Sequence, residues 1–200
     1  PALRFFGVNM ERGDAVAVKL QSLEDVDSTR AAWLHRELNH TPGMRDAVVS
    51  KDGKQLVTVM EFVPGESLNK LETPQSAEGV HHQRFGLVVS MREAARQLKN
   101  RHDQELGHRD IKPDNVRHNS VLPHKTQVID YGIVQPVNEP TNDRMISGTA
   151  PYMVPTEVLA NYVNARTRDL YGLALTYFKA MGGVRAIKKD RIPPPETGVT

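Results

Sequence analysis

The sequence lacks several features that would narrow its class at once. It contains a single tryptophan in 200 residues and no cysteine. The absence of cysteine excludes disulfide bonds and thiolate metal sites. This absence fits a reducing cytosol and, equally, a protein that must unfold and be exported. No apolar run approaches the roughly 18 residues that a membrane span needs, and the residues after Pro1 lack the charged-then-apolar pattern of a signal peptide. Composition therefore leaves the compartment open.

An excess of one charge is also missing. The 26 lysines and arginines stand against 24 aspartates and glutamates, which leaves a formal net charge of +2. The chain as a whole gives no electrostatic reason to expect nucleic acid or a membrane surface as a partner. With 38% hydrophobic and 25% charged residues, it has the composition of a soluble globular chain, long enough to bury one core or two small lobes.

The first third of the chain predicts a small antiparallel sheet with one helix. Residues 3–20 and 47–63 each show the pattern of two strands joined by a polar turn. Between these hairpins, Asp27 and Ser28 are N-cap residues ahead of a helix-compatible run that ends near Leu38.

The remainder of the chain, after the Pro-Gly pair at 64–65, predicts a mainly helical unit. Apolar residues recur at helical spacing over 85–98, and a last helix is expected over about 167–181. Short β-like runs lie between them, near Val116 and at 128–129. The chain thus divides into a β-rich part and a helical part.

Residues 108–115, HRDIKPDN, carry the first chemical motif. The octapeptide resembles the catalytic loop of protein kinases. In that loop a carboxylate beside the attacking hydroxyl orients it and takes its proton, which the resemblance assigns to Asp110, and an amide oxygen holds a magnesium ion, which it assigns to Asn115. The resemblance implies that Lys112 neutralises the transferred phosphoryl group, and a lysine at this place implies serine or threonine substrates.

The tripeptide Asp130-Tyr131-Gly132 follows the apolar run at 128–129. It looks like the Asp-Phe-Gly magnesium motif of the same family, with Tyr in place of Phe. The resemblance implies that Asp130 bridges the metal to the β- and γ-phosphates. Tyr131 keeps the aromatic plug and adds a hydroxyl that needs a partner or water.

Two later segments extend the resemblance. GTAPYMVPTE at 148–157 resembles the end of the kinase activation loop, with Thr156 as an insertion before Glu157. It implies that the Thr149 hydroxyl bridges the catalytic aspartate and lysine. The second segment is DLYGLA at residues 169–174. Here the resemblance implies that Asp169 holds the backbone of the catalytic loop.

Nucleotide-binding residues are implied on the N-terminal side. The run VAVK matches the strand whose lysine grips the α- and β-phosphates, which assigns Lys19, while Ala17 would cover the adenine ring. The run MEFV resembles the kinase hinge. Its Glu61 carbonyl and Val63 amide would hydrogen-bond adenine, with Glu66 close to the ribose.

The nucleotide site departs from the family pattern at two places. The Gly-x-Gly-x-x-Gly loop is not present in full: either Gly7 is its last glycine or the loop lies before Pro1. Because the amides of that loop bind phosphate, a shortened loop predicts modest nucleotide affinity. Arg117 falls where an apolar residue usually lies beneath adenine, and its methylene stem would pack there while the guanidinium reaches solvent.

The helix glutamate that pairs with the phosphate-binding lysine has several candidates. Counting forward from Lys19 by the family's usual spacing gives Glu37. Counting back from HTPGM, which looks like the loop after that helix, gives Ala31 or Ala32 instead. Glu24 is a further candidate, and absence of the glutamate is the remaining alternative.

The resemblance as a whole implies an α+β, two-lobed protein-kinase-like fold in one domain, residues 1–200. Residues 1–63 would form the N-lobe, a small antiparallel sheet plus one helix. Residues 64–200 would form a mainly helical C-lobe, truncated after about residue 181. ATP, Mg²⁺ and a protein substrate are the implied ligands, and a monomer without nucleic acid or a membrane span is expected.

The leading hypothesis is an ATP-dependent protein serine/threonine kinase of minimal size. It resembles the effector kinases that some bacterial pathogens secrete, so it would act in the cytoplasm, its own or a host cell's, on a host protein such as a chaperone or signalling protein. A pseudokinase scaffold is one alternative, although a binding module has no chemical need for the whole catalytic and metal-binding set. A small-molecule kinase is the other, although Lys112 and the segment around Thr149 favour protein substrates.

The activation segment carries residues that either require phosphorylation or replace it. Arg109 precedes the catalytic aspartate, and in kinases with that arginine a phosphate on the segment pairs with it. Thr141 and Ser147 are the available hydroxyls, and Arg144 supplies a second cation nearby.

We expect the double replacement Thr141→Ala with Ser147→Ala to leave turnover on an identified protein substrate unchanged. Glu139 and Asp143 lie in the same segment, and either carboxylate can reach Arg109 without any modification. A loss on the order of a hundredfold, restored by acidic replacements, would instead show that phosphorylation is the switch.

Overall fold

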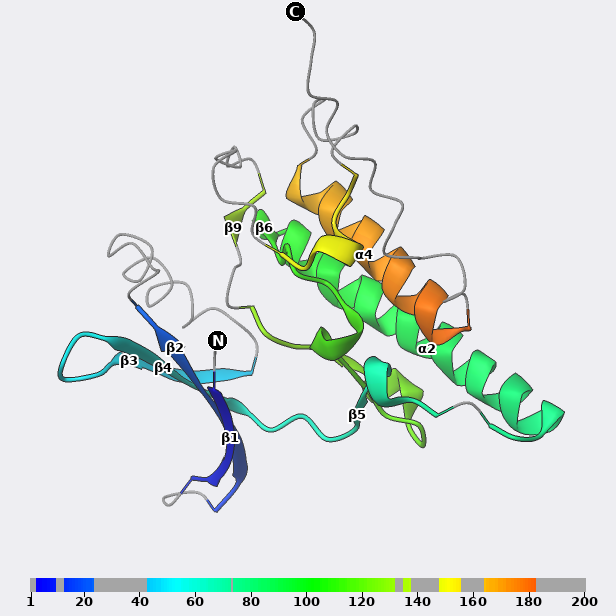
Figure 1. Cartoon of the computed structure of the whole chain (residues 1–200), viewed down its shortest axis with the longest axis horizontal. Helices are drawn as coiled ribbons and strands as arrows, with labels where there is room; N and C mark the ends of the chain where they lie inside the picture. Colours follow the sequence, from blue (N-terminus) through cyan, green and yellow to red (C-terminus); the bar gives the residue numbers. More distant parts are fainter. Residues whose placement is uncertain are drawn as a thin grey trace, which may run out of the picture. The chain divides into compact units, whose positions relative to one another are not determined.

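The structure is a computed structural model, and it describes most of the chain. The described residues are 3–9, 13–23, 43–72, 74–131, 135–137, 148–155 and 164–182. The chain separates into two compact units, residues 1–63 and residues 64–200, whose elements are labelled in Figure 1. Within the described residues, no helix is both long and apolar enough to cross a membrane.

The first unit is built on a four-stranded antiparallel sheet. Its strands are β1 (Leu3–Val8), β2 (Ala15–Ser22), β3 (Met44–Val49) and β4 (Gln55–Glu61). They lie in the order β1-β2-β4-β3, so both predicted hairpins are confirmed. The β2–β4 register places Ala17 opposite Met60 and Lys19 opposite Thr58. The helix expected between Asp27 and Leu38 lies outside the described residues.

The turn between β3 and β4 shows why the second hairpin forms where it does. The Asp52 carboxylate accepts hydrogen bonds from the Ser50 hydroxyl at 2.5 Å and from the Lys54 amide at 3.1 Å. Gly53 takes a φ of 71°, a left-handed conformation that costs glycine little. The short polar side chains and the glycine thus close the turn locally, as the sequence KDGK predicts.

The second unit contains two long helices among its described residues. Helix α2 spans Ala77–His102 and helix α4 spans Ala165–Ala180, and they pack side by side (Figure 1). The predicted range 85–98 covers only the middle of α2, because its first turns are largely exposed and give no apolar period. The Ser76 side chain, which accepts a hydrogen bond from the Gly79 amide at 3.0 Å, marks the true start.

Short elements of the second unit carry the loops of the candidate site. Strands β5 (Glu66–Ser67), β7 (Val116–His118) and β8 (Gln127–Val128) form one small sheet, and β6 (Leu106–Gly107) pairs with β9 (Gln135–Pro136). The 3₁₀ turns are η1 (Leu68–Lys70), η2 (Pro113–Asn115), η3 (Pro123–Lys125) and η4 (Ala150–Tyr152).

A buried hydroxyl network joins the two helices and the segment before β8. The Ser90 hydroxyl lies 2.6 Å from the Tyr177 hydroxyl and accepts a hydrogen bond from the Thr126 hydroxyl at 2.9 Å. All three side chains are almost fully buried. Burial raises the pKa of Tyr177, and its hydrogen bond to Ser90 offsets part of that shift.

We expect Tyr177→Phe to destabilise the fold by about 1 kcal/mol at neutral pH, since one buried hydrogen bond is lost. The raised pKa keeps the proton on folded Tyr177 while the unfolded chain releases it near its ordinary value of about 10. The stability of the wild type should therefore fall as the pH rises above about 10, and less steeply in the variant. Urea unfolding at neutral and alkaline pH measures both effects, with Tyr171→Phe on the same helix as control. A stability difference that is independent of pH would contradict the titration argument.

Candidate active site

The buried side chain of Asp169 holds the backbone of the HRD segment, residues 108–110. This α4 carboxylate is fully buried and accepts the backbone amide hydrogens of His108 at 2.7 Å and Arg109 at 2.6 Å. It also pairs with Nε2 of His102, at the end of α2, at 2.8 Å. Arg109 has a left-handed φ of 71°, so Asp169 anchors a strained loop. The predicted role of Asp169 is thus confirmed.

Helix α4 approaches this loop at a glycine. A Cβ atom built on Gly172 would lie 2.8 Å from the Ile111 carbonyl oxygen, closer than real Cβ atoms come. The helix axis can therefore run directly beneath the loop backbone because position 172 carries no side chain.

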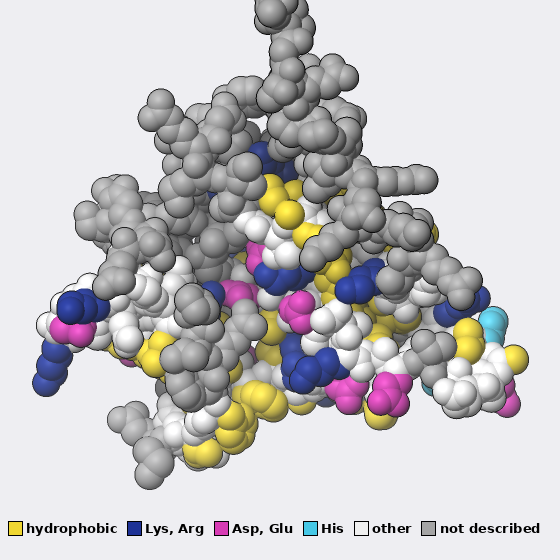
Figure 2. Space-filling view, viewed as in Figure 1, with side chains coloured by type: hydrophobic (Ala, Val, Ile, Leu, Met, Phe, Trp, Pro, Cys, Tyr) yellow, Lys and Arg dark blue, Asp and Glu magenta, His cyan; other side chains and the backbone are white. Residues whose placement is uncertain are grey.

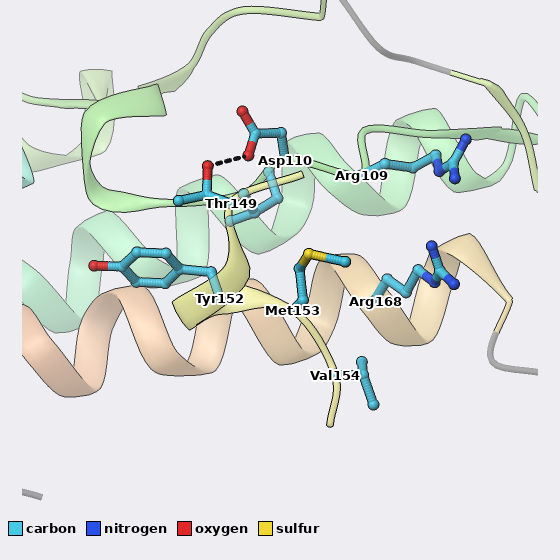
Figure 3. Close-up of a pocket in the computed structure, with 8 residues that line it drawn as sticks. Arg109, Asp110, Thr149, Tyr152, Met153, Val154 and Arg168 are labelled. Atoms are coloured by element: carbon cyan, nitrogen blue, oxygen red, sulfur yellow. Dashed lines mark hydrogen bonds between the residues drawn. The ribbon is translucent and has the colours of Figure 1, made fainter. Parts of the chain in front are cut away.

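Asp110, Lys112 and Thr149 form a closed triangle of hydrogen bonds. Lys112 Nζ donates to Asp110 Oδ2 at 2.6 Å and to Thr149 Oγ1 at 2.9 Å. The Thr149 hydroxyl donates to Asp110 Oδ1 at 2.8 Å, which is the dashed line in Figure 3. The predicted bridge by Thr149 is confirmed, and it fixes the orientation of the carboxylate.

Asn115 presents an oxygen atom that no described group satisfies. Its amide nitrogen donates to the Asp110 carbonyl at 2.8 Å and contacts Asp110 Oδ2 at 3.2 Å. Its Oδ1 atom is buried and has no hydrogen-bond partner in the described structure. Because a buried unpaired oxygen is costly, a cation ligand is the natural partner for it.

Asp130 comes to the same end of a small sheet as Asn115. Strands β7 and β8 pair antiparallel with Val116 opposite Val128, and the Ile129 amide donates to the Asn115 carbonyl at 2.9 Å. The two candidate metal ligands therefore leave neighbouring strands at adjacent places.

The donor set fits magnesium better than a transition metal. Within the residues that the structure describes, no three His, Cys, Asp or Glu side chains gather to hold a metal ion. Magnesium instead uses one or two protein oxygens together with substrate phosphates and water. Asp130 and Asn115 supply such oxygens.

A pocket adjoins the Asp110 side chain (Figure 3). Its lining residues are Arg109, Asp110, Ile111, Thr149, Tyr152, Met153, Val154 and Arg168. The Tyr152 hydroxyl accepts a hydrogen bond from Lys179 Nζ at 3.2 Å. The lining thus combines apolar side chains with two arginines, whose guanidinium groups lie away from the Asp110 carboxylate in this view.

The predicted nucleotide-binding residues divide between the two units. Lys19 lies on β2 and is buried, with Ala17 on the same strand, while Gly7 lies on β1 opposite Val16. Glu61 ends β4, and Val63 is the last residue of the first unit. Glu66 belongs to the second unit and is exposed on β5.

Several predicted residues lie outside the described part of the chain. They are Glu24, Ala31, Ala32, Glu37, Gly132, Glu139, Thr141, Asp143, Arg144, Ser147, Thr156 and Glu157.

Sequence reasoning missed two contacts and misplaced one group. His102 binds Asp169, and Arg101 lies over the Tyr131 ring. The available signal was the position of these two residues in the last turn of the helix that precedes HRD. The expectation for Arg117 was wrong in one respect, because its half-buried guanidinium donates a hydrogen bond to the Gly65 carbonyl instead of reaching into solvent.

The face of the molecule in Figure 2 carries mixed charge. Lysine and arginine side chains alternate there with acidic ones rather than gathering into one basic patch. This distribution accords with the formal net charge of +2.

Comparisons with known proteins follow the same motifs. The family described as "Protein kinase domain" matches residues 5–193. The chain belongs to the protein kinase family. The eukaryotic-like serine/threonine kinases are its named relatives, and the α+β kinase fold is shared with a solved member. The Cydia pomonella granulovirus kinase PK-1 has a TM-score of 0.63 and 15% identity, and the match covers 90% of this chain and 66% of the viral one.

Two bacterial kinases illustrate how far the similarity extends. The serine/threonine-protein kinase PknA of Mycobacterium tuberculosis H37Ra is 28% identical over 177 residues, which is 79% of this chain and 39% of that protein. The PknA of Corynebacterium glutamicum is 30% identical over 191 residues, which is 92% of this chain and 37% of that protein. This kinase-family chain therefore spans less than two fifths of the length of these relatives.

We expect Asp169→Asn to lower the free energy of unfolding by about 3 kcal/mol. The side-chain amide would replace one carboxylate oxygen, which accepts hydrogen bonds, with a nitrogen, which donates them, and this nitrogen would face the amide or imidazole donors that the carboxylate now binds. Urea unfolding measures the loss. Asp103→Asn, which removes one partner of an exposed i,i+4 pair with Lys99, is the control and should change stability by less than about 0.5 kcal/mol. Equal stability of Asp169→Asn and wild type would contradict the anchoring role.

Proposed function

We propose that this chain is an ATP- and magnesium-dependent protein serine/threonine kinase. The observation that carries the proposal is the hydrogen-bonded triangle of Asp110, Lys112 and Thr149. It places a carboxylate, a cation and a hydroxyl in one fixed arrangement on a loop that Asp169 anchors from below. Such preorganised charge is the main contribution that a protein makes to phosphoryl transfer.

The reaction assigned to this site is a single group transfer. The oxygen of a substrate hydroxyl forms a bond to the γ-phosphorus of ATP, the bond from that phosphorus to the bridging oxygen breaks, and ADP leaves with the electron pair. Asp110 accepts the hydroxyl proton, and Lys112 balances negative charge on the transferred group. Thr149 keeps both side chains in place.

Asp130 and Asn115 are the residues that would hold magnesium, which neutralises phosphate charge when bound. The unpaired Oδ1 of Asn115 supports this assignment. Lys19 would bind the α- and β-phosphates.

The remaining nucleotide contacts are proposed from the kinase pattern. Ala17 would cover adenine, and the backbone of Glu61 and Val63 would hydrogen-bond it. Glu66 would lie near the ribose and Gly7 near the phosphates. Glu37, the candidate partner of the phosphate-binding lysine, completes the proposed set.

The proposed substrate is the side-chain hydroxyl of serine or threonine in a protein. The position of Lys112 and its contact with Thr149 support this choice over a small-molecule acceptor. The finer proposal is a monomeric, effector-type kinase that works in the cytoplasm of a host cell on a host protein. Its support is the absence of cysteine, which suits a chain that must be unfolded for export.

We expect purified protein with Mg²⁺ and ATP to phosphorylate itself or a protein substrate. Asp110→Asn, Asp130→Ala and Lys19→Ala should each reduce the rate by orders of magnitude. They would remove, in turn, the acceptor of the hydroxyl proton, a magnesium ligand and the cation that binds the α- and β-phosphates. Mass spectrometry of phosphoproteins made by wild type and by Asp110→Asn measures the transfer. Equal activity in wild type and Asp130→Ala would favour a scaffold that binds without catalysis.

Thr149 offers a matched pair of variants for the triangle itself. Thr149→Val keeps the shape and removes the hydroxyl, so kcat should fall by about tenfold or more. Thr149→Ser keeps the hydroxyl and should retain more activity than Thr149→Val. The reverse order would mean that the hydrogen bonds to Asp110 and Lys112 do not matter for transfer.

A further inference from the structure

The aromatic residue after Asp130 has two buried neighbours. The Tyr131 side chain is 8% exposed, and its ring centroid lies 4.8 Å from that of His108 in the catalytic loop. The guanidinium carbon of Arg101 lies over the same ring, 5.0 Å from its centroid. Arg101 belongs to the last turn of α2 and is itself 3% exposed. A tyrosine and an arginine are therefore buried against each other.

Each of these two polar groups offsets the cost of burying the other. The Arg101 guanidinium lies over the Tyr131 ring, and its Nη1 also donates a hydrogen bond to the Gln104 side-chain oxygen at 3.1 Å. A buried guanidinium needs such a partner, and the face of an aromatic ring attracts it.

The backbone beside this pair is strained at Asp130. Its φ of 68° is a left-handed conformation that is uncommon for a residue other than glycine and that persists only where the surroundings impose it. The Ile129 amide donates to the Asn115 carbonyl at 2.9 Å, and the Val137 amide donates to the Glu105 carbonyl at 2.8 Å. Tyr131 is a buried side chain between these two backbone anchors, immediately after the strained residue.

We propose that Arg101 is a positioning residue that acts through Tyr131 and holds Asp130 in its left-handed conformation. His108 also packs against the ring and is held in turn, because its Nε2 contacts the Ile129 carbonyl at 3.0 Å. Removing the guanidinium leaves the Tyr131 hydroxyl buried without that cation. Removing the hydroxyl is less severe, because Arg101 keeps the Gln104 side-chain oxygen and the face of the ring, and an apolar pair leaves neither polar group buried.

The catalytic consequence rests on the proposed function. If Asp130 holds magnesium, loosening its backbone weakens the metal site before it affects the chemistry at Asp110. The loss should therefore appear in the magnesium dependence of the reaction rather than in turnover at saturating magnesium.

The first test measures backbone amide exchange by NMR in the full chain without nucleotide. Arg101→Leu should speed exchange of the Ile129 and Val137 amides by about tenfold, and Tyr131→Phe should speed it less. The double variant should return both rates to within about threefold of wild type. Amides in the middle of α4 should keep their wild-type rates in all three variants.

The control for this test is Lys99→Leu, which removes another cation of the same helical turn. Lys99 is exposed and pairs with Asp103, so exchange at Ile129 and Val137 should not change. Unchanged exchange in Arg101→Leu would overturn the proposal. Equal acceleration across the whole second unit would overturn it too, because it would mean a general stabilising role.

The second test uses ATP turnover with Mg²⁺ as the titrated probe. The Mg²⁺ concentration for half-maximal rate should rise about tenfold in Arg101→Leu, while kcat at saturating Mg²⁺ falls by less than about threefold. A fall in kcat with unaltered Mg²⁺ dependence would overturn the link to Asp130. If the wild type transfers no phosphate, the proposed function fails, and the exchange measurement still decides the role of Arg101.

Discussion

The buried carboxylate of Asp169 is the interaction on which the arrangement of the site depends. Its two oxygens receive two consecutive backbone amides and one imidazole. A left-handed residue such as Arg109 costs roughly 1–2 kcal/mol, and charge-assisted hydrogen bonds of this kind are strong enough to offset it. Without this anchor, Asp110 would have no fixed backbone from which to meet Lys112 and Thr149.

Strain and support recur together in the second unit. Arg109 and Asp130 both have positive φ values; Arg109 precedes the candidate catalytic carboxylate, and Asp130 is itself a candidate metal ligand. Asp169 of α4 holds the Arg109 amide, and we propose the same kind of support for Asp130 from Arg101 in the last turn of α2. The helices thus supply the rigidity, and the short loops supply the chemistry.

The local geometry of the candidate site could be predicted from the sequence because each motif is a short contiguous run. HRDIKPDN and the segment around Thr149 predicted the triangle, and Asp169 was expected to hold the loop; both geometries are confirmed. The two hairpins followed from their turns, whose information is equally local, whereas the pairing of β2 with β4 was not predicted.

Other features depend on contacts between distant segments. The Arg101–Tyr131 pair cannot be read from either residue, since it requires the end of α2 to lie beside the residue after Asp130. The start of α2 was missed because exposed turns carry no apolar period, and only the Ser76 cap marks it. The metal, nucleotide and catalytic roles of the site residues stay predictions.

Gly172 has a consequence for how mutational data on this chain would be interpreted. Any side chain at this position meets the Ile111 carbonyl, so the helix must move away and take Asp169 with it. A saturation screen scored by activity would then rank Gly172 among the most sensitive positions, although it has no functional group. The loss of activity on substitution of Gly172 would reflect the short distance between α4 and the loop at Ile111. A substitution there would be tolerated only if the backbone of the helix or the loop also shifted.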